Sequence, residues 1–511
     1  MQIIQFNTVL KQLSGYAVFL IVFSMLLQSC ADLDPNIEEF TEIPGKYEDI
    51  IDAQEGITGV YNQLYSATNF NDAYAPSWGG DDITTNFGAN KEDFRQFDQR
   101  NVESTNARLN NNWRNSLNII NNANIVIDRA NDLVGNDTVD QLILERIIGE
   151  AYFLRGMIFQ HLARIHGRII LPITVDPIIY SSLSSQIEVY EQIESDFLEA
   201  ESRLPDTNPD SVTGATRPNK GSARALLARL YMDWAGFPER DTSKYTDAQQ
   251  KASQVINNKG AHGFELVSDF GDLWKVENRF NTEGVYTIPY CNACGLGNFK
   301  YGILGLPGDL SGWQECLAEI KFFEDFPAGP RKEATYRTDL EWESFNDQKN
   351  PVFAKITGPI GDLAPRAFLT DRSDFWIRYA EVLLIYAESS GRSGNVTPEA
   401  WEALNMIRRR AEGLPFATPD PSVDLTTGDI AELAVTERKW EFAGEFLRWY
   451  DLVRLERIEQ ALGDRQPQVS IDPATGSIID ERNPILGSLG TDNYFAPIPQ
   501  AAIDDNPNLG N

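Results

Sequence analysis

The chain has 511 residues, and its composition, 42% hydrophobic and 11% aromatic, is typical of a folded globular protein and excludes a disordered one. Its 75 acidic side chains outnumber the 44 basic ones and give a formal net charge of −31. This charge argues against nucleic acid as a partner, because phosphates require a basic surface, and it disfavours polyanionic ligands unless a local basic patch or a cation intervenes. A neutral ligand is the better expectation.

Residues 1–29 are predicted to be a cleaved signal peptide. Tyr16–Leu27 is an uncharged apolar run, too short to span a bilayer, which needs about 20 apolar residues. The tetrapeptide Leu27-Gln28-Ser29-Cys30 matches a bacterial lipobox, so we expect Cys30 to become the mature N-terminus and to carry lipid. An ordinary secretory signal and a core helix are the alternatives, because Lys11 is the only basic residue before the run. Residues 30–45 are expected to form a lipidated flexible tether.

A helical scaffold is predicted for residues 46–261, interrupted by a polar candidate ligand loop at 68–106. Apolar residues recur at helical spacing, most clearly over 46–67, 108–131 and 138–166. Three times, a mostly apolar helix that ends near a glycine is followed by an amphipathic partner. These pairs are 151–167 with 189–204, 223–236 with 245–256, and 375–391 with 398–411. Repeated helical hairpins of this kind predict a mainly α fold, a superhelix of the tetratricopeptide type.

Helical periodicity disappears over residues 262–374, where Gly, Pro, aromatic residues and short strand-like runs predominate. We expect an irregular, loop-rich insert with short strands that packs on the helical scaffold. Residues 375–511 return to helices and close with an extended tail rich in Pro and Asn. One charged helix is expected over 430–462, and its polar face should carry two i,i+3 ion pairs. These are Glu445 with Arg448 and Asp451 with Arg454.

No metal site is expected. Asp206, Asn208 and Asp210 have the spacing of the first ligands of a calcium loop, but the twelfth position is Arg217 where a bidentate Glu is needed, so a turn is predicted. The three histidines are not spaced as zinc ligands with the cysteines. Cys291 and Cys294 form a C-x-x-C motif that Gly-Leu-Gly follows instead of a helix N-terminus, which leaves a local disulfide or two inert thiols.

Four stretches of the mature chain resemble the SusD/RagB family of outer-membrane lipoproteins of Bacteroidetes. They are EAYFLRG at 150–156 leading into HGRIILP at 166–172, FWIRYAEVLLIYAE at 375–388 with LNMIRRRA at 404–411, TERKWEFAGEFLRWYDLVR at 436–454, and FAPIP at 495–499 with NPNL at 506–509. The chain departs from the family pattern at Ala502, where an acidic residue is usual, and it lacks the customary Q-N-P-G-Y ending. Networks of Arg, Trp and carboxylate side chains on helices mostly fix helix packing, so we take none of these motif residues as ligand contacts.

The resemblance implies a SusD-like fold and a cell-surface subunit that captures oligosaccharide or polysaccharide and hands it to a SusC-like TonB-dependent outer-membrane transporter. It implies no catalytic residue and no cofactor. The sequence agrees, since we find no nucleophile elbow, zinc-protease motif or phosphate-binding loop. Capture of peptides or glycopeptides, as in the RagB branch, and a helical glycoside hydrolase are the alternatives. A neutral glucan is the preferred ligand because of the net charge and the aromatic loops.

Neutral sugars are bound by stacking on exposed aromatic rings beside hydrogen-bonding groups, and such rings lie in loops on a rigid scaffold. The loop stretch YAPSWGGDD at 74–82 has this chemistry and falls where the family commonly places ligand contacts. The candidate ligand residues are Trp78, Asp81, Asp82 and Asn86 in the loop, and Tyr301 and Trp313 in the insert. A buried anchor is the alternative for Trp78, because Trp is highly buried on average. The Trp residues 274, 401, 440 and 449 are expected to pack in the scaffold.

Overall fold

The computed structural model describes residues 45–68, 72–86, 91–175, 181–210, 212–300, 312–313, 315–338, 350–358, 369–472 and 474–510. The predicted signal peptide, Cys30, nearly all of the tether and Tyr301 lie outside these residues. Residues 48–511 form one compact unit, to which the following description applies. Within the described residues, no helix has the length and apolar character that a membrane span requires.

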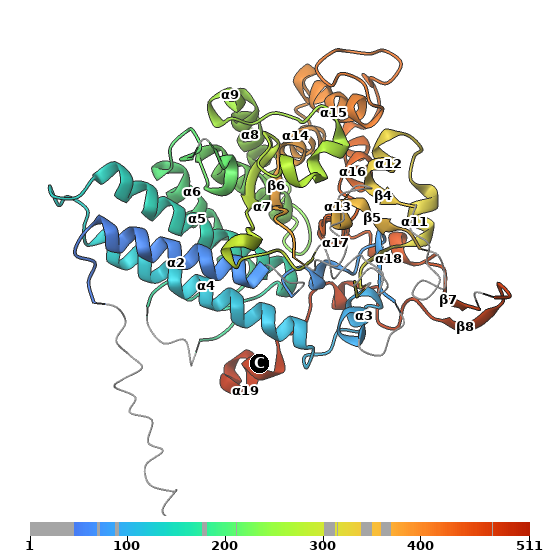
Figure 1. The fold of residues 1–511 in the computed structure, drawn as a ribbon, viewed down its shortest axis with the longest axis horizontal. Coiled ribbons are helices and arrows are strands. Elements are labelled where there is room, and N and C mark those ends of the chain that lie inside the picture. The colour runs from blue at the N-terminus through green and yellow to red at the C-terminus, as the bar shows by residue number, and fades with distance from the viewer. Residues whose placement is uncertain are drawn as a thin grey trace, which may run out of the picture. The chain divides into compact units, whose positions relative to one another are not determined.

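Long helices pack side by side in the order in which they follow along the chain. In the series listed below, each helix from α2 to α8 contacts the helix that follows it in the list. Helix α8 lies against α14, and α14 packs on α15 and α16 (Figure 1). The series consists of α2 (Ile50–Thr68), α4 (Ala107–Asn131), α5 (Gln141–His166), α6 (Gln186–Arg203), α7 (Lys220–Trp234), α8 (Lys244–Asn257), α14 (Tyr379–Ser393), α15 (Pro398–Ala411) and α16 (Ile430–Glu441). The mainly α class predicted from the sequence is confirmed.

The helix ends are determined by local sequence signals. Asp140 caps α5, because its carboxylate accepts hydrogen bonds from two backbone N–H groups of the first turn. Gly167 ends the same helix at φ +69°, a conformation that glycine adopts without steric cost. Ser185 and Glu188 form a complete capping box at the start of α6. These signals explain why periodicity alone located the long helices closely.

Four antiparallel two-stranded sheets lie among the described residues. They pair β1 (Ile83–Thr84) with β3 (Leu317–Ala318), β2 (Gly284–Ile288) with β6 (Asp374–Arg378), β4 (Tyr336–Arg337) with β5 (Val352–Phe353), and β7 (Gln468–Ile471) with β8 (Ile478–Arg482). The short helices α3 (Glu92–Asp98), α11 (Ile320–Asp325), α12 (Pro330–Thr335) and α13 (Ala354–Thr357) accompany them. Pairing with β2 keeps residues 374–378 extended, so the helix predicted from 375 begins at 379 instead.

The prediction of a single helix over 430–462 is wrong. The chain forms α16, a turn at 442–447, α17 (Arg448–Arg454) and α18 (Ile458–Leu462). Gly444 and Phe446 have positive φ angles of 75° and 63°, which no helix accommodates. Of the two expected ion pairs, Asp451 with Arg454 is present at 2.9 Å, whereas Glu445 turns inward and binds other partners. The C-terminal tail is also not wholly extended, because it contains α19 (Gln500–Asp505).

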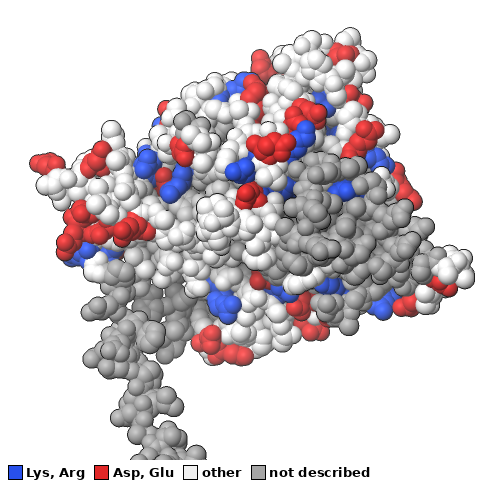
Figure 2. Space-filling view, in the orientation of Figure 1, with Lys and Arg blue, Asp and Glu red and all other residues white. Residues whose placement is uncertain are grey.

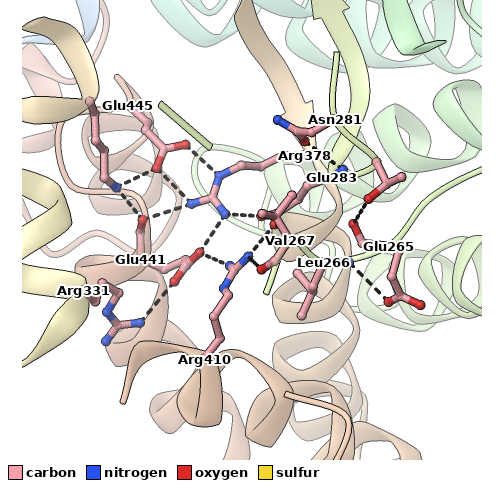
Figure 3. A network of polar contacts seen from close by, with 12 residues as sticks. Glu265, Leu266, Val267, Asn281, Glu283, Arg331, Arg378, Arg410, Glu441 and Glu445 are labelled. Atoms are coloured by element: carbon pink, nitrogen blue, oxygen red, sulfur yellow. Dashed lines mark hydrogen bonds and ion pairs between the residues drawn. The ribbon is translucent and has the colours of Figure 1, made fainter. Parts of the chain in front are cut away.

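Acidic and basic side chains are interspersed on the face shown in Figure 2, and a second set of charges is buried between the helices. Arg378 at the end of β6 is the centre of this buried network (Figure 3). Its guanidinium binds Glu283 at 2.7 Å, Glu441 at 2.6 Å and Glu445 at 2.8 Å. Arg410 of α15 binds Glu283 and Glu441 as well. The network therefore ties β2, β6, α15, α16 and the 442–447 turn together.

The cations determine the ionisation of the buried carboxylates. Burial alone would raise the pKa of Glu441, but Arg410, Arg378 and Arg331 together hold that pKa well below its usual range. Lys355 of α13 donates to Glu445 at 2.7 Å, and burial lowers the pKa of this lysine to about 8. Glu441 thus stays charged at every pH at which the protein is expected to work, and its charge is compensated on several sides.

Removal of Arg378 should be severely destabilising. Arg378→Met leaves three buried carboxylates short of a cation, and breaking a buried ion pair in this way costs about 3–5 kcal/mol in the free energy of unfolding. Arg240→Met is the matched control, because Arg240 pairs with Glu456 at 2.8 Å on the surface and an exposed pair contributes at most about 1 kcal/mol. Chemical denaturation measures both. Similar losses in the two variants would contradict the role of the network.

Candidate functional site

Trp313 presents the one indole that is exposed among the described Trp residues, with 46% of its surface accessible. Strand pairing brings it near a residue from the predicted ligand loop. Because β1 and β3 are antiparallel, with Thr84 opposite Leu317, the chain after β1 and the chain before β3 lie at the same end of this sheet. Asn86 and Trp313, predicted separately in the loop and in the insert, therefore belong to segments that lie at the same end of the β1–β3 pair.

A buried ion pair supports the Trp313 ring. Lys91 donates to Glu315 at 2.7 Å, both side chains are almost fully buried, and the Lys91 ammonium lies 5.4 Å from the centre of the Trp313 ring. Lys91 immediately precedes α3, so this helix fixes it in position. We call Asn86, Lys91, Trp313 and Glu315 the Trp313 surface. It combines an exposed aromatic face with a rigid polar support.

Trp78 does not belong to this surface. Its indole is fully buried and stacks on Phe94 with a centroid distance of 4.6 Å, within a core that also includes Trp449. A buried ring offers no face to a ligand, so the prediction that Trp78 contacts a ligand is wrong. The alternative, a buried anchor of the loop, describes its position.

Asp81 and Asp82 hold neighbouring segments in place. Asp81 accepts two hydrogen bonds from Arg448, at 2.6 and 3.1 Å, and Asp82 accepts one from the backbone N–H of Gly444 at 2.9 Å. Asp82 is 1% exposed, and burial raises its pKa to about 6 although the Gly444 N–H opposes this. A carboxylate in this position cannot reach a ligand at the surface. Asp82 instead fixes the 442–447 turn, and Asp81 holds Arg448 at the start of α17.

This turn carries Phe446, whose φ of 63° is unusual for a residue other than glycine and costs about 1–3 kcal/mol. Its ring lies 5.0 Å from the ring of Tyr74. The Tyr74 hydroxyl donates to Asp374 at 2.9 Å, and Asp374 also pairs with the buried Lys300. Two small hollows, of about 50 and 40 Å³, lie beside these rings, and Phe375 lines both. We call the larger one the aromatic hollow.

The residues of the aromatic hollow were not predicted from the sequence. Tyr74 lies in the loop stretch at 74–82, but of the aromatic residues in this stretch only Trp78 was predicted to contact a ligand. Phe375 and Trp376 lie in β6 where a helix was predicted, and Phe446 lies in the turn that interrupts the helix predicted over 430–462. Their polar neighbours Gln160 and His161 are on α5. No local pattern would have revealed that these four segments meet.

A larger cleft of about 290 Å³ lies between α11, α16 and α18. Its charged side chains largely pair with one another or with nearby groups. Asp81 binds Arg448 at 2.6 Å and Lys321 binds Asp325 at 2.5 Å. The cleft therefore presents no surplus of either sign, and we do not regard it as the primary site.

The motifs considered for metal and thiol chemistry have structural roles. Asp210 accepts hydrogen bonds from the backbone of Val212 and Thr213 and from the Thr213 hydroxyl, as expected for a turn. The described residues contain no group of three or more His, Cys, Asp or Glu side chains arranged to hold a metal ion. Cys291 and Cys294 are joined by a disulfide, which is one of the two alternatives that the sequence left open.

Comparisons with known proteins give one consistent family. Residues 364–511 match the model of the SusD family, and residues 32–232 match a model described as "Starch-binding associating with outer membrane". SusD-like protein P2 of Formosa agariphila is 26% identical, over 97% of this chain and 98% of its own length. A crystal structure of a SusD homologue from Bacteroides thetaiotaomicron superimposes with a TM-score of 0.74 at 21% identity, over 91% of this chain and 97% of the homologue. A structure named as a laminarin-binding SusD-like protein gives a TM-score of 0.72 at 23% identity, over 90% and 98%.

Asp82 should make the stability of the fold depend on pH. Its pKa is raised from an ordinary 3.8 to about 6, so the folded state binds this proton more tightly than the unfolded state does. The resulting stabilisation of the fold is present below about pH 4 and is lost as the pH rises through about 6. Asp82→Asn removes the charge but keeps an acceptor for Gly444. Between pH 4 and 7.5, the unaltered chain should therefore lose about 1–3 kcal/mol more in unfolding free energy than Asp82→Asn.

Denaturation curves recorded across this pH range measure the difference. Asp480→Asn is the control, because Asp480 is an exposed carboxylate on β8, and its stability profile should run parallel to that of the unaltered chain. A parallel profile for Asp82→Asn would show that the Asp82 carboxylate does not titrate in the predicted range.

Proposed function

The chain belongs to the SusD/RagB family, and we propose that it is a surface lipoprotein of the outer membrane that captures a neutral glycan and delivers it to a SusC-like TonB-dependent transporter. The observation that carries this proposal is the exposed Trp313 ring on its rigid support. An aromatic ring can bind the apolar C–H face of a sugar, while neighbouring polar groups exchange hydrogen bonds with its hydroxyls.

The Trp313 surface is suited to a sugar for two physical reasons. The indole is held in place before ligand arrives, since Lys91 and Glu315 are buried beneath it and little side-chain motion is lost on binding. Asn86, at the same end of the β1–β3 pair, supplies an amide that can both donate and accept hydrogen bonds. One stacked ring gives only modest affinity, so a polymer that offers many equivalent units is a better ligand than a short sugar.

The net charge and the distribution of charged side chains favour a neutral glycan as the ligand. The net charge of −31 repels polyanions, and the acids and bases on the visible face are interspersed without a continuous basic area (Figure 2). A protein of the same fold is named for binding laminarin, which is a neutral glucan. We therefore regard laminarin as the first polysaccharide to test. The proposal requires no catalytic step, and incubation with the polysaccharide should release no shorter sugars.

Trp313→Ala should weaken polysaccharide binding by about tenfold, because the loss of one aromatic contact costs about 1 kcal/mol or slightly more. Affinity electrophoresis of the mature chain in gels that contain laminarin or another neutral glucan measures this as a loss of retardation. Trp401→Ala is the control, because Trp401 lies on α15, which carries none of the Trp313 surface. Unchanged retardation of a folded Trp313→Ala chain would exclude the proposed site, and released oligosaccharides would indicate a hydrolase.

Cys30→Ala should move the chain from the membrane to the soluble fraction of the cell, because the thiol that carries the lipid is removed. Cell fractionation followed by immunoblotting measures the distribution. Cys316→Ala is the matched control, since Cys316 is a buried free thiol inside the folded unit. The lipoprotein assignment fails if both variants remain in the membrane fraction to the same extent.

A further inference from the structure

The aromatic hollow is a second concave site that the proposed capture surface does not use. Its rim consists of partly exposed aromatic side chains from three segments, and its floor reaches α5. The residues that the argument uses are Tyr74, Gln160, His161, Phe375, Trp376 and Phe446. The ring of Tyr74 lies 5.0 Å from that of Phe446, and the ring of Trp376 lies 5.5 Å from that of His161. The hollow is thus lined by two pairs of neighbouring rings.

Gln160 gives this hollow a specific polar group. The side chain is 3% exposed, and its amide nitrogen is buried without a hydrogen-bond partner among the described residues. A buried N–H donor without an acceptor costs free energy, so a polar side chain at such a position needs a reason. A ligand oxygen that enters the hollow would provide the acceptor.

The charges that border the hollow are already neutralised by protein partners. Arg164 binds Asp233 at 3.0 Å, Arg229 binds Glu381 at 2.6 Å, and Glu445 is held by Arg378. Burial lowers the pKa of His161 to about 3, so this ring is neutral at physiological pH. The hollow therefore attracts neither an anion nor a cation. It suits a neutral group with one apolar end and one hydrogen-bond acceptor.

The size of the hollow limits the group further. A volume of about 50 Å³ has room for a few water molecules, which is sufficient for a small substituent such as an acetyl group. The methyl of an acetyl group would contact the aromatic walls, and its carbonyl oxygen would accept from the Gln160 amide. Other common sugar substituents fit less well, because a hydroxyl lacks the apolar end and a carboxylate or sulfate carries a charge.

We propose that the aromatic hollow binds the acetyl group of an acetylated sugar unit, so that the chain prefers glycans that carry N-acetyl or O-acetyl substituents. This inference rests on the proposed capture of glycans and adds a chemical selection to it. The strained backbone of Phe446 supports it, because strain of this kind persists where the surrounding structure enforces a functional geometry. Asp82 and the Arg378 network enforce it here by holding the 442–447 turn.

Calorimetric titration of the mature chain with two matched disaccharides tests the inference. N,N′-diacetylchitobiose and cellobiose share the same β-1,4-linked backbone and differ in the acetamido groups. We expect the acetylated sugar to bind about tenfold more tightly, and Gln160→Leu to remove this preference. The same titration with acetylated xylo-oligosaccharides, before and after alkaline removal of their O-acetyl groups, shows whether an acetyl ester is bound as well as an acetamido group. A preference for either acetylated probe supports the inference.

Gln160→Leu should also raise the midpoint of thermal unfolding, because it replaces an unpaired buried amide by an apolar side chain of similar size. Gln250→Leu is the control, since Gln250 is exposed on α8, and it should change neither the preference nor the midpoint. Equal affinity for acetylated and unacetylated probes, binding of neither, or an unchanged preference in Gln160→Leu would overturn the inference.

The outcome is separable from that of the proposed function. If Trp313→Ala abolishes polysaccharide retention while acetylation has no effect, the capture surface stands and the acetyl site fails. If acetylated disaccharides are preferred and Trp313→Ala retains full affinity for polysaccharide, the acetyl site stands and the Trp313 surface fails.

Discussion

The guanidinium of Arg378 is the group on which the arrangement of the aromatic hollow depends. It is 1% exposed and binds three carboxylates, which come from the residue before β2, from α16 and from the 442–447 turn. A buried carboxylate that loses its cation keeps a large desolvation cost, so these segments cannot separate without leaving charge uncompensated. The turn is therefore held against β6. The ring of Phe446 and the backbone N–H that Asp82 binds take their positions from this constraint.

The stretches that identify the family bind mainly to one another. Glu388 of the second stretch pairs with Arg454 of the third at 2.7 Å, and Arg410 of the second pairs with Glu441 of the third at 2.6 Å. In the first stretch, Arg155 reaches Asp196 of α6 at 2.6 Å. Such residues specify how the helices pack and make no contact that is available to a ligand. Family membership therefore predicts the scaffold well. The Trp313 surface lies outside these stretches, whereas the aromatic hollow takes Phe375, Trp376 and Phe446 from them.

Sequence reasoning predicted the long helices because their signals are local. An Asp or Ser cap, a terminal glycine and a 3.6-residue apolar period suffice for α5 and α6. It failed where distant partners decide the conformation. Glu445 was assigned to an exposed helix face, yet Arg378, 67 residues away, draws it into the interior. The burial of Trp78 depends on Phe94 and on a core shared with α17, and neither can be recognised from the loop itself. Trp313 and Asn86 were predicted from loop chemistry alone, whereas their position at the same end of one sheet depends on the β1–β3 pairing.

A crystal structure of the mature chain with an oligosaccharide cut from a polysaccharide that it retains would show directly whether Trp313 binds the sugar. We expect a sugar ring parallel to the indole of Trp313, with polar contacts from its neighbours at the same end of the β1–β3 pair. A sugar bound in the charged cleft between α11, α16 and α18, with the Trp313 indole uncovered, would contradict this expectation.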